Sequence, residues 1–325
     1  MKYLSNQNGL LDKKSPCVAT SLKHAKKIAR QLGLAKQLNN AIRDFSDKQG
    51  ANLCVQLDGK IERILIIGGV SDNLSLGSLR KSMVAIANLL VQMPINEATF
   101  ELQALKNKET TWDMLIQEIS YAVSNSAYQY SKHKSEAAKK YSLRQIRFHG
   151  PEAKTEKINS AMRYANALES GLQIAKDLGN EPPNVCNPNY LLKESRKLGK
   201  NSSVKVSSIN ESKMKDLGMG AFLAVSKGSE APGQMITIRY DGGKRQDAPI
   251  VLIGKGITFD TGGISLKPPA AMDEMKFDMC GAASVIGATA AAIQAKLKIN
   301  LITIVAAAEN MPSGKATRPG DIVKS

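Results

Sequence analysis

The polypeptide has 325 residues and a mass of 35.0 kDa, and its 45 basic residues against 29 acidic ones give a formal net charge of +16. An apolar content of 42% and a charged content of 23% are ordinary for globular proteins, which excludes a disordered or collagen-like chain. No apolar run reaches the roughly 18 residues that cross a bilayer, and the first residues contain no signal-peptide core. We therefore expect an unexported protein that has no membrane partner.

The four cysteines lie far apart in the sequence and form no CxxC motif. They are Cys17, Cys54, Cys186 and Cys280. Such a sparse pattern favours a reducing compartment over a secreted, disulfide-linked protein, so we expect a cytoplasmic location.

Strands and helices are predicted to alternate through the first 150 residues. Residues 52–68 hold two β-branched runs around an Asp-Gly turn, which is typical of a β-hairpin. Apolar residues recur every three or four positions from Leu76 to Met93, which predicts an amphipathic helix that ends before Pro94. Further predicted elements are a strand at 98–104, a helix at 111–131 and a strand at 142–148. This alternation is typical of an α/β domain.

A second α/β domain is predicted after a long helix. Apolar residues from Ile158 to Ala175 form one stripe of a helix predicted at 152–178, and the glycine, asparagine and prolines of residues 179–188 end it. Strands are predicted at 203–209, 235–240, 249–254 and 299–308, and the last two are apolar enough for burial on both faces. We therefore expect an N-terminal α/β domain at 1–150, a connecting helix at 151–180 and a C-terminal α/β domain with a central mixed sheet at 181–325.

The positive excess is larger in the first 150 residues, which hold 22 basic and 12 acidic residues. Two basic stretches contribute to it: Lys23, Lys26, Lys27 and Arg30 in the first, and Lys132, Lys134, Lys139, Lys140, Arg144 and Arg147 in the second. Either stretch could meet nucleic acid or another acidic partner, and this defines our alternative function, a non-catalytic binding protein. We prefer a solvated helix face, because neither stretch is uninterrupted and no nucleic-acid-binding module is recognised.

The residues most suited to chemistry lie between positions 254 and 281. Lys255 follows the apolar run 249–253, at the carboxyl end of the predicted strand, where open α/β sheets place their sites. Asp260, Lys267 and Asp278 follow on the same loop-rich edge. Two carboxylates here could share a proton as an acid–base pair or bind divalent metal ions through oxygen. The alternative is two surface ion pairs in a long loop.

Three other kinds of site do not fit the sequence. The triplet Asp260-Thr261-Gly262 matches that of aspartic proteases, but their second copy is missing. No segment has the GxxxxGK[ST] pattern of a phosphate loop. The three histidines, His24, His133 and His149, lack the spacing of a zinc site, so we expect them at the surface or in packing roles.

Four segments of the C-terminal half carry a more specific pattern. They are NEPPN at 180–184, VLIGKGITFDTGGISLKP at 251–268, MKFDMCGAA at 275–283 and AENMPSGKATRPGD at 308–321. In these segments the chain closely resembles the leucyl (cytosol) aminopeptidase family of dinuclear metallo-exopeptidases. The N-terminal half agrees with that family in architecture, an α/β domain followed by a connecting helix.

The resemblance implies a cytoplasmic aminopeptidase that releases N-terminal amino acids, leucine among them, from peptides, and that assembles as a homohexamer. It implies that Lys255, Asp260 and Asp278 bind two divalent ions, zinc, manganese or magnesium, with Asp260 bridging them. Asp278 also meets the free amine of the substrate, Lys267 polarises the scissile carbonyl, and Met275 lines the pocket for the first side chain. These five residues form the implied substrate site. In the family, a metal-bridging water attacks that carbonyl and an arginine-held bicarbonate is the general base, which fits two-metal hydrolysis.

One motif of the family is absent from the 325 residues. NTDAEGR supplies an Asp and a Glu to the metals and the arginine for bicarbonate, and it should follow shortly after Lys324. We therefore expect a catalytic domain that is incomplete at its C-terminus, with an uncovered sheet edge that favours association. We also expect little turnover and weakened metal binding from the 325-residue chain, because Lys255, Asp260 and Asp278 alone leave both ions under-coordinated.

Overall fold

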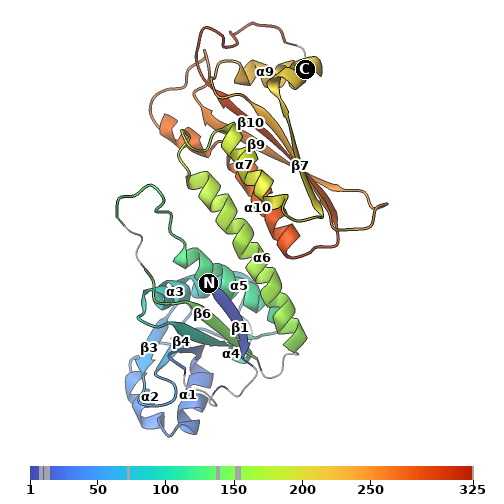
Figure 1. The fold of residues 1–325 in the computed structure, drawn as a ribbon. Helices are drawn as coiled ribbons and strands as arrows, with labels where there is room; N and C mark the ends of the chain where they lie inside the picture. The colour runs from blue at the N-terminus through green and yellow to red at the C-terminus, as the bar shows by residue number, and fades with distance from the viewer. Residues whose placement is uncertain (7–9, 11–14, 72–73, 137–139, 151–154, 324–325) are drawn as a thin grey trace. The chain divides into compact units, whose positions relative to one another are not determined.

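The computed structural model describes residues 1–6, 10, 15–71, 74–136, 140–150 and 155–323. Lys139 of the second basic stretch and the expected start of the connecting segment at 151–154 lie outside the described residues. The chain divides into two compact units, unit 1 at residues 1–169 and unit 2 at residues 170–325 (Figure 1). The boundary falls inside helix α6 (Thr155–Asn180), within the segment that the sequence assigns to a connecting helix.

Unit 1 contains a six-stranded sheet of order β1-β6-β5-β2-β4-β3. Its strands are β1 (Lys2–Asn6), β2 (Val18–Ser21), β3 (Asn52–Gln56), β4 (Arg63–Ile67), β5 (Glu97–Glu101) and β6 (Gln145–His149). Neighbouring strands run parallel except β3 and β4, whose antiparallel pairing confirms the hairpin predicted at 52–68. The carboxyl ends of β2, β4 and β5 therefore meet at one edge of the sheet.

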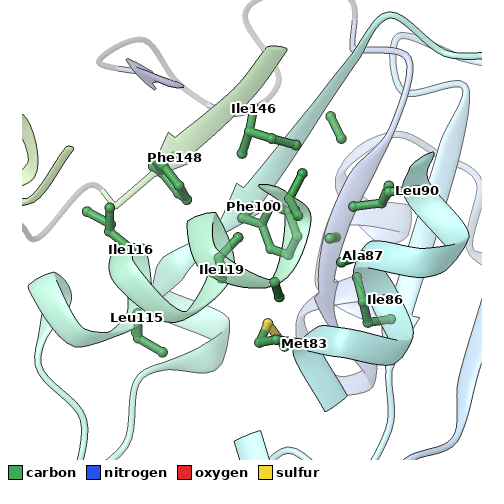
Figure 2. Close-up of a cluster of buried hydrophobic side chains, with 14 of the residues drawn as sticks. Met83, Ile86, Ala87, Leu90, Phe100, Leu115, Ile116, Ile119, Ile146 and Phe148 are labelled. Carbon is green, nitrogen blue, oxygen red and sulfur yellow. The ribbon is translucent and has the colours of Figure 1, made fainter. Parts of the chain in front are cut away.

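Helices α3 (Leu76–Gln92) and α5 (Trp112–Ala127) bury the apolar stripes expected from the sequence. Ser75 caps α3 by accepting a hydrogen bond from the amide of Ser78, and the helix ends before Pro94. Figure 2 shows side chains of α3, α5, β5 and β6 in one buried cluster, with Met83, Ile86, Ala87, Leu90, Phe100, Leu115, Ile116, Ile119, Ile146 and Phe148 labelled. This cluster attaches both helices to the sheet.

Several elements of unit 1 differ from the sequence prediction. The strand predicted at 98–104 ends at Glu101, and α4 (Leu102–Leu105) is a short helix. Strands β1 and β2 and helices α1 (Leu22–Gln31) and α2 (Ala35–Ala41) were not predicted. Strand β2, with the sequence VATS, is buried along its whole length, so it has no alternation of apolar and polar residues from which a strand could be predicted.

Unit 2 contains a four-stranded sheet of order β7-β8-β10-β9. Its strands are β7 (Val204–Asn210), β8 (Gln234–Asp241), β9 (Ile250–Asp260) and β10 (Asn300–Asn310). β9 and β10 run parallel and the other pairs are antiparallel, which confirms a mixed sheet. The helices of the unit, besides the second half of α6, are α7 (Pro188–Leu198), α8 (Glu211–Asp216), α9 (Gly220–Ser226), the 3-10 helix η1 (Met272–Phe277) and α10 (Cys280–Gln294).

Strand β9 is longer and more exposed than predicted. It runs to Asp260 instead of ending near Gly254, and within the described residues it pairs with β10 alone. Ile253 is 74% exposed and Val251 is 49% exposed, so the prediction of burial on both faces is wrong for this strand. A run of β-branched residues indicates a strand, but it does not indicate which neighbours cover that strand. An edge strand pairs on one side only, so its other side is less protected from solvent.

The segment Met272–Gln294 is long and apolar enough to cross a membrane by length and composition. A core helix of a soluble protein passes the same test, so this match is weak evidence. In α10, Ala282, Ala283 and Ile286 are buried in the hydrophobic core that includes Ile236 of β8 and Val305 of β10. The apolar composition of α10 is therefore explained by its packing in the core of unit 2.

The four cysteines are free thiols and differ in accessibility. Cys17 is completely buried, and burial raises the pKa of its thiol to about 12, whereas Cys54 on β3 is exposed. Because the thiolate is the reactive form, we expect iodoacetamide at pH 8 to alkylate Cys54 at least about a hundredfold faster than Cys17. Peptide mass spectrometry over a time course would measure both rates, with urea-unfolded protein as the control in which the rates converge. Equal rates in the native protein would contradict the burial of Cys17.

Candidate metal and substrate site

The distal half of β9 presents Lys255 and Asp260 on the same face of the sheet. Lys255 pairs with Ala306 on β10, and Asp260 pairs with Asn310, so two residues five apart on β9 face two residues four apart on β10. The register shifts between Ile257 and Asp260, where β9 contains one extra residue. Such a bulge reverses the alternation of side chains, and it places Lys255 and Asp260 on one face although their spacing is odd. The predicted position of Lys255 at the end of its strand is wrong: Asp260 occupies the end.

The carboxylate of Asp260 accepts three hydrogen bonds. The Lys267 ammonium donates to Oδ2 over 2.6 Å, while the Gly262 amide and the Asn310 side-chain amide donate to Oδ1 over 2.9 and 2.8 Å. Burial by itself raises the pKa of Asp260, but the bonds from Lys267, Gly262 and Asn310 outweigh it and hold the pKa below its ordinary value. Asp260 is therefore a carboxylate at neutral pH. Its side chain is 16% exposed.

The loop after β9 is folded so that Lys267 returns to Asp260. The Lys267 amide donates to the Thr261 carbonyl over 2.9 Å, and the Thr261 amide donates to the Asn310 carbonyl over 3.0 Å. Gly262 has φ +89°, and a Cβ there would lie 2.4 Å from the Ser265 carbonyl oxygen, so this turn requires glycine. The sequence GG at 262–263 thus allows the backbone to form the turn that brings Lys267 back to Asp260.

A second pair forms between Lys255 and Asp278. The Lys255 ammonium lies 2.6 Å from Asp278 Oδ1, and the lysine side chain is 60% exposed while the aspartate is 19% exposed. The backbone of α10 packs closely on β9 here. A Cβ on Gly281 would lie 3.0 Å from the backbone nitrogen of Lys255, and a Cβ on Gly254 would lie 2.8 Å from the Cα of Ala282. These glycines allow the start of α10 to place Asp278 beside the strand.

The 3-10 helix η1 joins the two pairs into one site. Met275 on η1 lies with its Sδ 3.1 Å from the Lys267 ammonium, and Asp278 follows at the end of the same helix, its amide bonded to the Met275 carbonyl. The sequence singles out five residues, and contacts among β9, the loop after it and η1 connect them: Lys255, Asp260, Lys267, Met275 and Asp278. Sequence reasoning did not single out Asn310, although it lies inside the segment AENMPSGKATRPGD that carried the resemblance.

One carboxylate oxygen of the site indicates whether these residues fit a metal ion. The Asp278 Oδ2 atom is buried and has no hydrogen-bond partner. A buried carboxylate oxygen without a partner is costly unless a cation or donor completes it, so Asp278 fits a divalent cation. Within the described ranges, no three His, Cys, Asp or Glu side chains gather closely enough to hold a metal ion. Asp260 and Asp278 can thus supply carboxylate oxygens, and Lys255 can add a nitrogen only after losing its proton.

Two carboxylates paired with two lysines thus gather around the distal half of β9, the loop after it and η1, within an α/β unit. Residues 173–325 match the model of the cytosol aminopeptidase family, catalytic domain. The matched residues make up nearly all of unit 2, which therefore belongs to the catalytic domain of this family.

Similar curated proteins and solved structures agree with this assignment. A probable cytosol aminopeptidase of Pseudomonas syringae pv. syringae is 45% identical over 284 residues, which cover 86% of this chain and 57% of that protein. The cytosol aminopeptidase of Pseudomonas aeruginosa is 41% identical with the same coverage. A mutant of tomato leucine aminopeptidase superposes with a TM-score of 0.81 at 25% identity, over 99% of this chain and 65% of that one. The bottromycin maturation enzyme BotP in complex with Mn has the same fold, with a TM-score of 0.74 at 23% identity.

The chain spans less than two thirds of the length of these relatives. The matched part includes all five residues of the candidate site, since Lys255 to Asp278 lie inside 173–325. Activity, metal, substrate and assembly of the relatives are therefore carried to this chain only as proposals.

Proposed function

We propose that this protein is a metal-dependent aminopeptidase that releases N-terminal amino acids, leucine and others, from peptides in the cytoplasm. The observation that carries the proposal is the convergence of two carboxylates and two lysines around η1, with the Asp278 Oδ2 atom left without a partner. Membership of unit 2 in the cytosol aminopeptidase family favours this enzyme over the non-catalytic alternative. From the resemblance to the family, we also propose a homohexamer.

Each residue of the site has a proposed role that the family resemblance implies and that its contacts support. Asp260, Asp278 and Lys255 would hold two divalent ions, zinc, manganese or magnesium, through two carboxylates and one lysine nitrogen. When bound, these ions supply the activation of the water that attacks the peptide carbonyl. Asp278 has a free carboxylate oxygen that can also accept from the α-amine of the substrate.

Lys267 and Met275 face the substrate side of the same site in this proposal. The Lys267 ammonium is anchored by Asp260, and the lysine side chain is 35% exposed, so the ammonium can donate to the scissile carbonyl and stabilise the negative charge that develops there. The Met275 thioether contacts that ammonium, and this contact supports the proposal that its adaptable apolar side chain lines the pocket for the first residue of a peptide. The general base we propose is bicarbonate, in a form of the protein that carries the NTDAEGR motif and its arginine.

Hydrolysis of leucyl amide by the 325-residue polypeptide is the direct test. We expect little or no turnover and weak binding of zinc or manganese, because Asp260 and Asp278 are the only carboxylates that the described site contributes. The polypeptide should be mass-verified and assayed with zinc or manganese and bicarbonate, with calorimetry reporting metal binding. A polypeptide extended through NTDAEGR is the matched control and is expected to cleave. Metal-dependent cleavage by the 325-residue form would refute the assigned set of metal ligands. Absence of cleavage by the extended form would refute the proposed aminopeptidase activity.

A further inference from the structure

A cavity of unit 1 contains the first basic stretch of the sequence. Its volume is about 710 Å³, and it is lined by Leu22, Lys23, His24, Lys26, Lys27, Arg30 and Asp47. This size falls within the range typical of small-molecule sites. The four cations come from one helix, α1, while Asp47 comes from the loop between α2 and β3.

The cations in this cavity are not neutralised by the protein. In the part of the chain that the structure describes, Lys23, Lys26, Lys27 and Arg30 have no ion pair and no side-chain hydrogen bond, and all four are exposed. The lining carboxylate of Asp47 accepts a hydrogen bond from the Gly69 amide over 2.8 Å. Four positive charges against one engaged carboxylate make the cavity strongly attractive to anions.

The position of the cavity in the sheet also favours a ligand site. After β2 the chain passes through α1 and α2 to β3 and β4, which lie on one side of β2. After β5 it passes to β6, on the other side, so the connections that follow β2 and β5 diverge between these two strands. Ligands of open α/β sheets bind outside the carboxyl ends of strands at such a point. His24, in the first turn of the helix that follows β2, bridges this point through its Nδ1, which lies 3.0 Å from the carboxylate of Glu101 at the end of β5.

The spacing of the cations along α1 favours an extended anion. Lys23 and Arg30 are seven residues apart on α1, which corresponds to roughly 10 Å along the helix. Lys26 and Lys27 lie between them, so positive charge continues over a distance longer than one phosphate group. Lysine ammoniums act as point charges suited to phosphate oxygens. We propose that this cavity binds a ligand with two or more linked phosphate groups, a function separate from peptide hydrolysis.

Titration of the full chain with sodium tripolyphosphate tests the proposal by calorimetry at 50 mM salt. We expect saturable one-to-one binding that weakens as salt increases, because the contacts are to phosphate. The double variant Lys26→Gln/Lys27→Gln should weaken binding at least about tenfold. The matched control Lys134→Gln/Lys140→Gln removes the same charge from the second basic stretch and should change affinity less than about twofold. Both variants should keep the wild-type circular dichroism spectrum and thermal midpoint.

Two further probes distinguish the source of the phosphates. Competition by ATP but not by a short oligothymidylate would identify a free nucleotide-like polyphosphate, and stronger competition by the oligonucleotide would identify a nucleic-acid backbone. Either result agrees with the proposed chemistry. Absence of saturable binding at 50 mM salt, equal losses in both double variants, or equal competition by a glutamate peptide of the same charge would overturn it.

Discussion

Replacing Gly171 with alanine is expected to destabilise unit 2 by about 2–4 kcal/mol, the largest stability effect that we predict. Gly171 on α6 and Gly287 on α10 bring the two helices into backbone contact, because a Cβ on Gly171 would lie 2.3 Å from the Gly287 carbonyl oxygen. Backbone atoms cannot rotate away as a side chain can, so the helices must separate and lose packing around Ile286. The usual gain of up to about 1 kcal/mol from replacing glycine in a helix is too small to compensate.

Urea unfolding and hydrogen exchange would measure this effect. Amides of α10, residues 280–294, are expected to exchange faster in Gly171→Ala than in the wild type. Gly77→Ala is the matched control, because Gly77 lies in α3 and a Cβ there meets no atom within 4 Å. That control should be neutral or stabilised by at most about 1 kcal/mol. A Gly171→Ala protein as stable as the control would contradict the close packing of α6 and α10.

Replacing Lys267 with glutamine is expected to lower kcat for leucyl amide by about 10²–10³-fold in any form of the protein that hydrolyses it. The ammonium is held by Asp260 over 2.6 Å and retains exposed surface for a substrate carbonyl. An interaction that strengthens as charge develops on the carbonyl oxygen is lost from the transition state more than from the bound substrate. KM should therefore change much less than kcat.

Two controls make this kinetic prediction specific. Lys205→Gln removes a lysine from the exposed strand position on β7 and should leave both parameters within about twofold of the wild type. Lys267→Arg keeps the charge and should recover part of the lost rate. If Lys267→Gln raised KM and left kcat unchanged, Lys267 would be a binding residue and the proposed role would be wrong.

The candidate site shows where sequence reasoning succeeds and where it stops. The density of Lys255, Asp260, Lys267 and Asp278 within two dozen residues indicated a site, and the structure places them in two pairs joined by η1. Residues close in sequence can be brought together by short turns, and the glycines of such turns can be recognised in the sequence. Asn310 was missed because it reaches Asp260 from β10, fifty residues further along the chain. The spacing of neighbouring residues in the sequence does not predict a hydrogen bond between two strands so far apart along the chain.

Local sequence patterns predicted the helices and strands that are long enough to repeat their pattern of apolar residues. The apolar stripes of α3 and α5 predicted their location and their buried face, because a helix of four turns repeats its pattern several times. The sequence by itself also determined the α/β class, the free cysteines and the family, since these depend on composition and on ordered motifs. The length and exposure of β9 were predicted incorrectly, because they depend on which strand pairs with it.

Only the tertiary structure decided how the chemistry is arranged. The bulge between Ile257 and Asp260 brings Lys255 and Asp260 to one face, and it is visible only in the register with β10. The cavity along α1 likewise requires the loop that carries Asp47 to lie beside the helix. Sequence determines which groups are available and where the chain turns, whereas pairing between distant strands determines which of those groups meet. Those pairings are set by the packing of the whole core, and short windows of sequence contain too little of it to specify them.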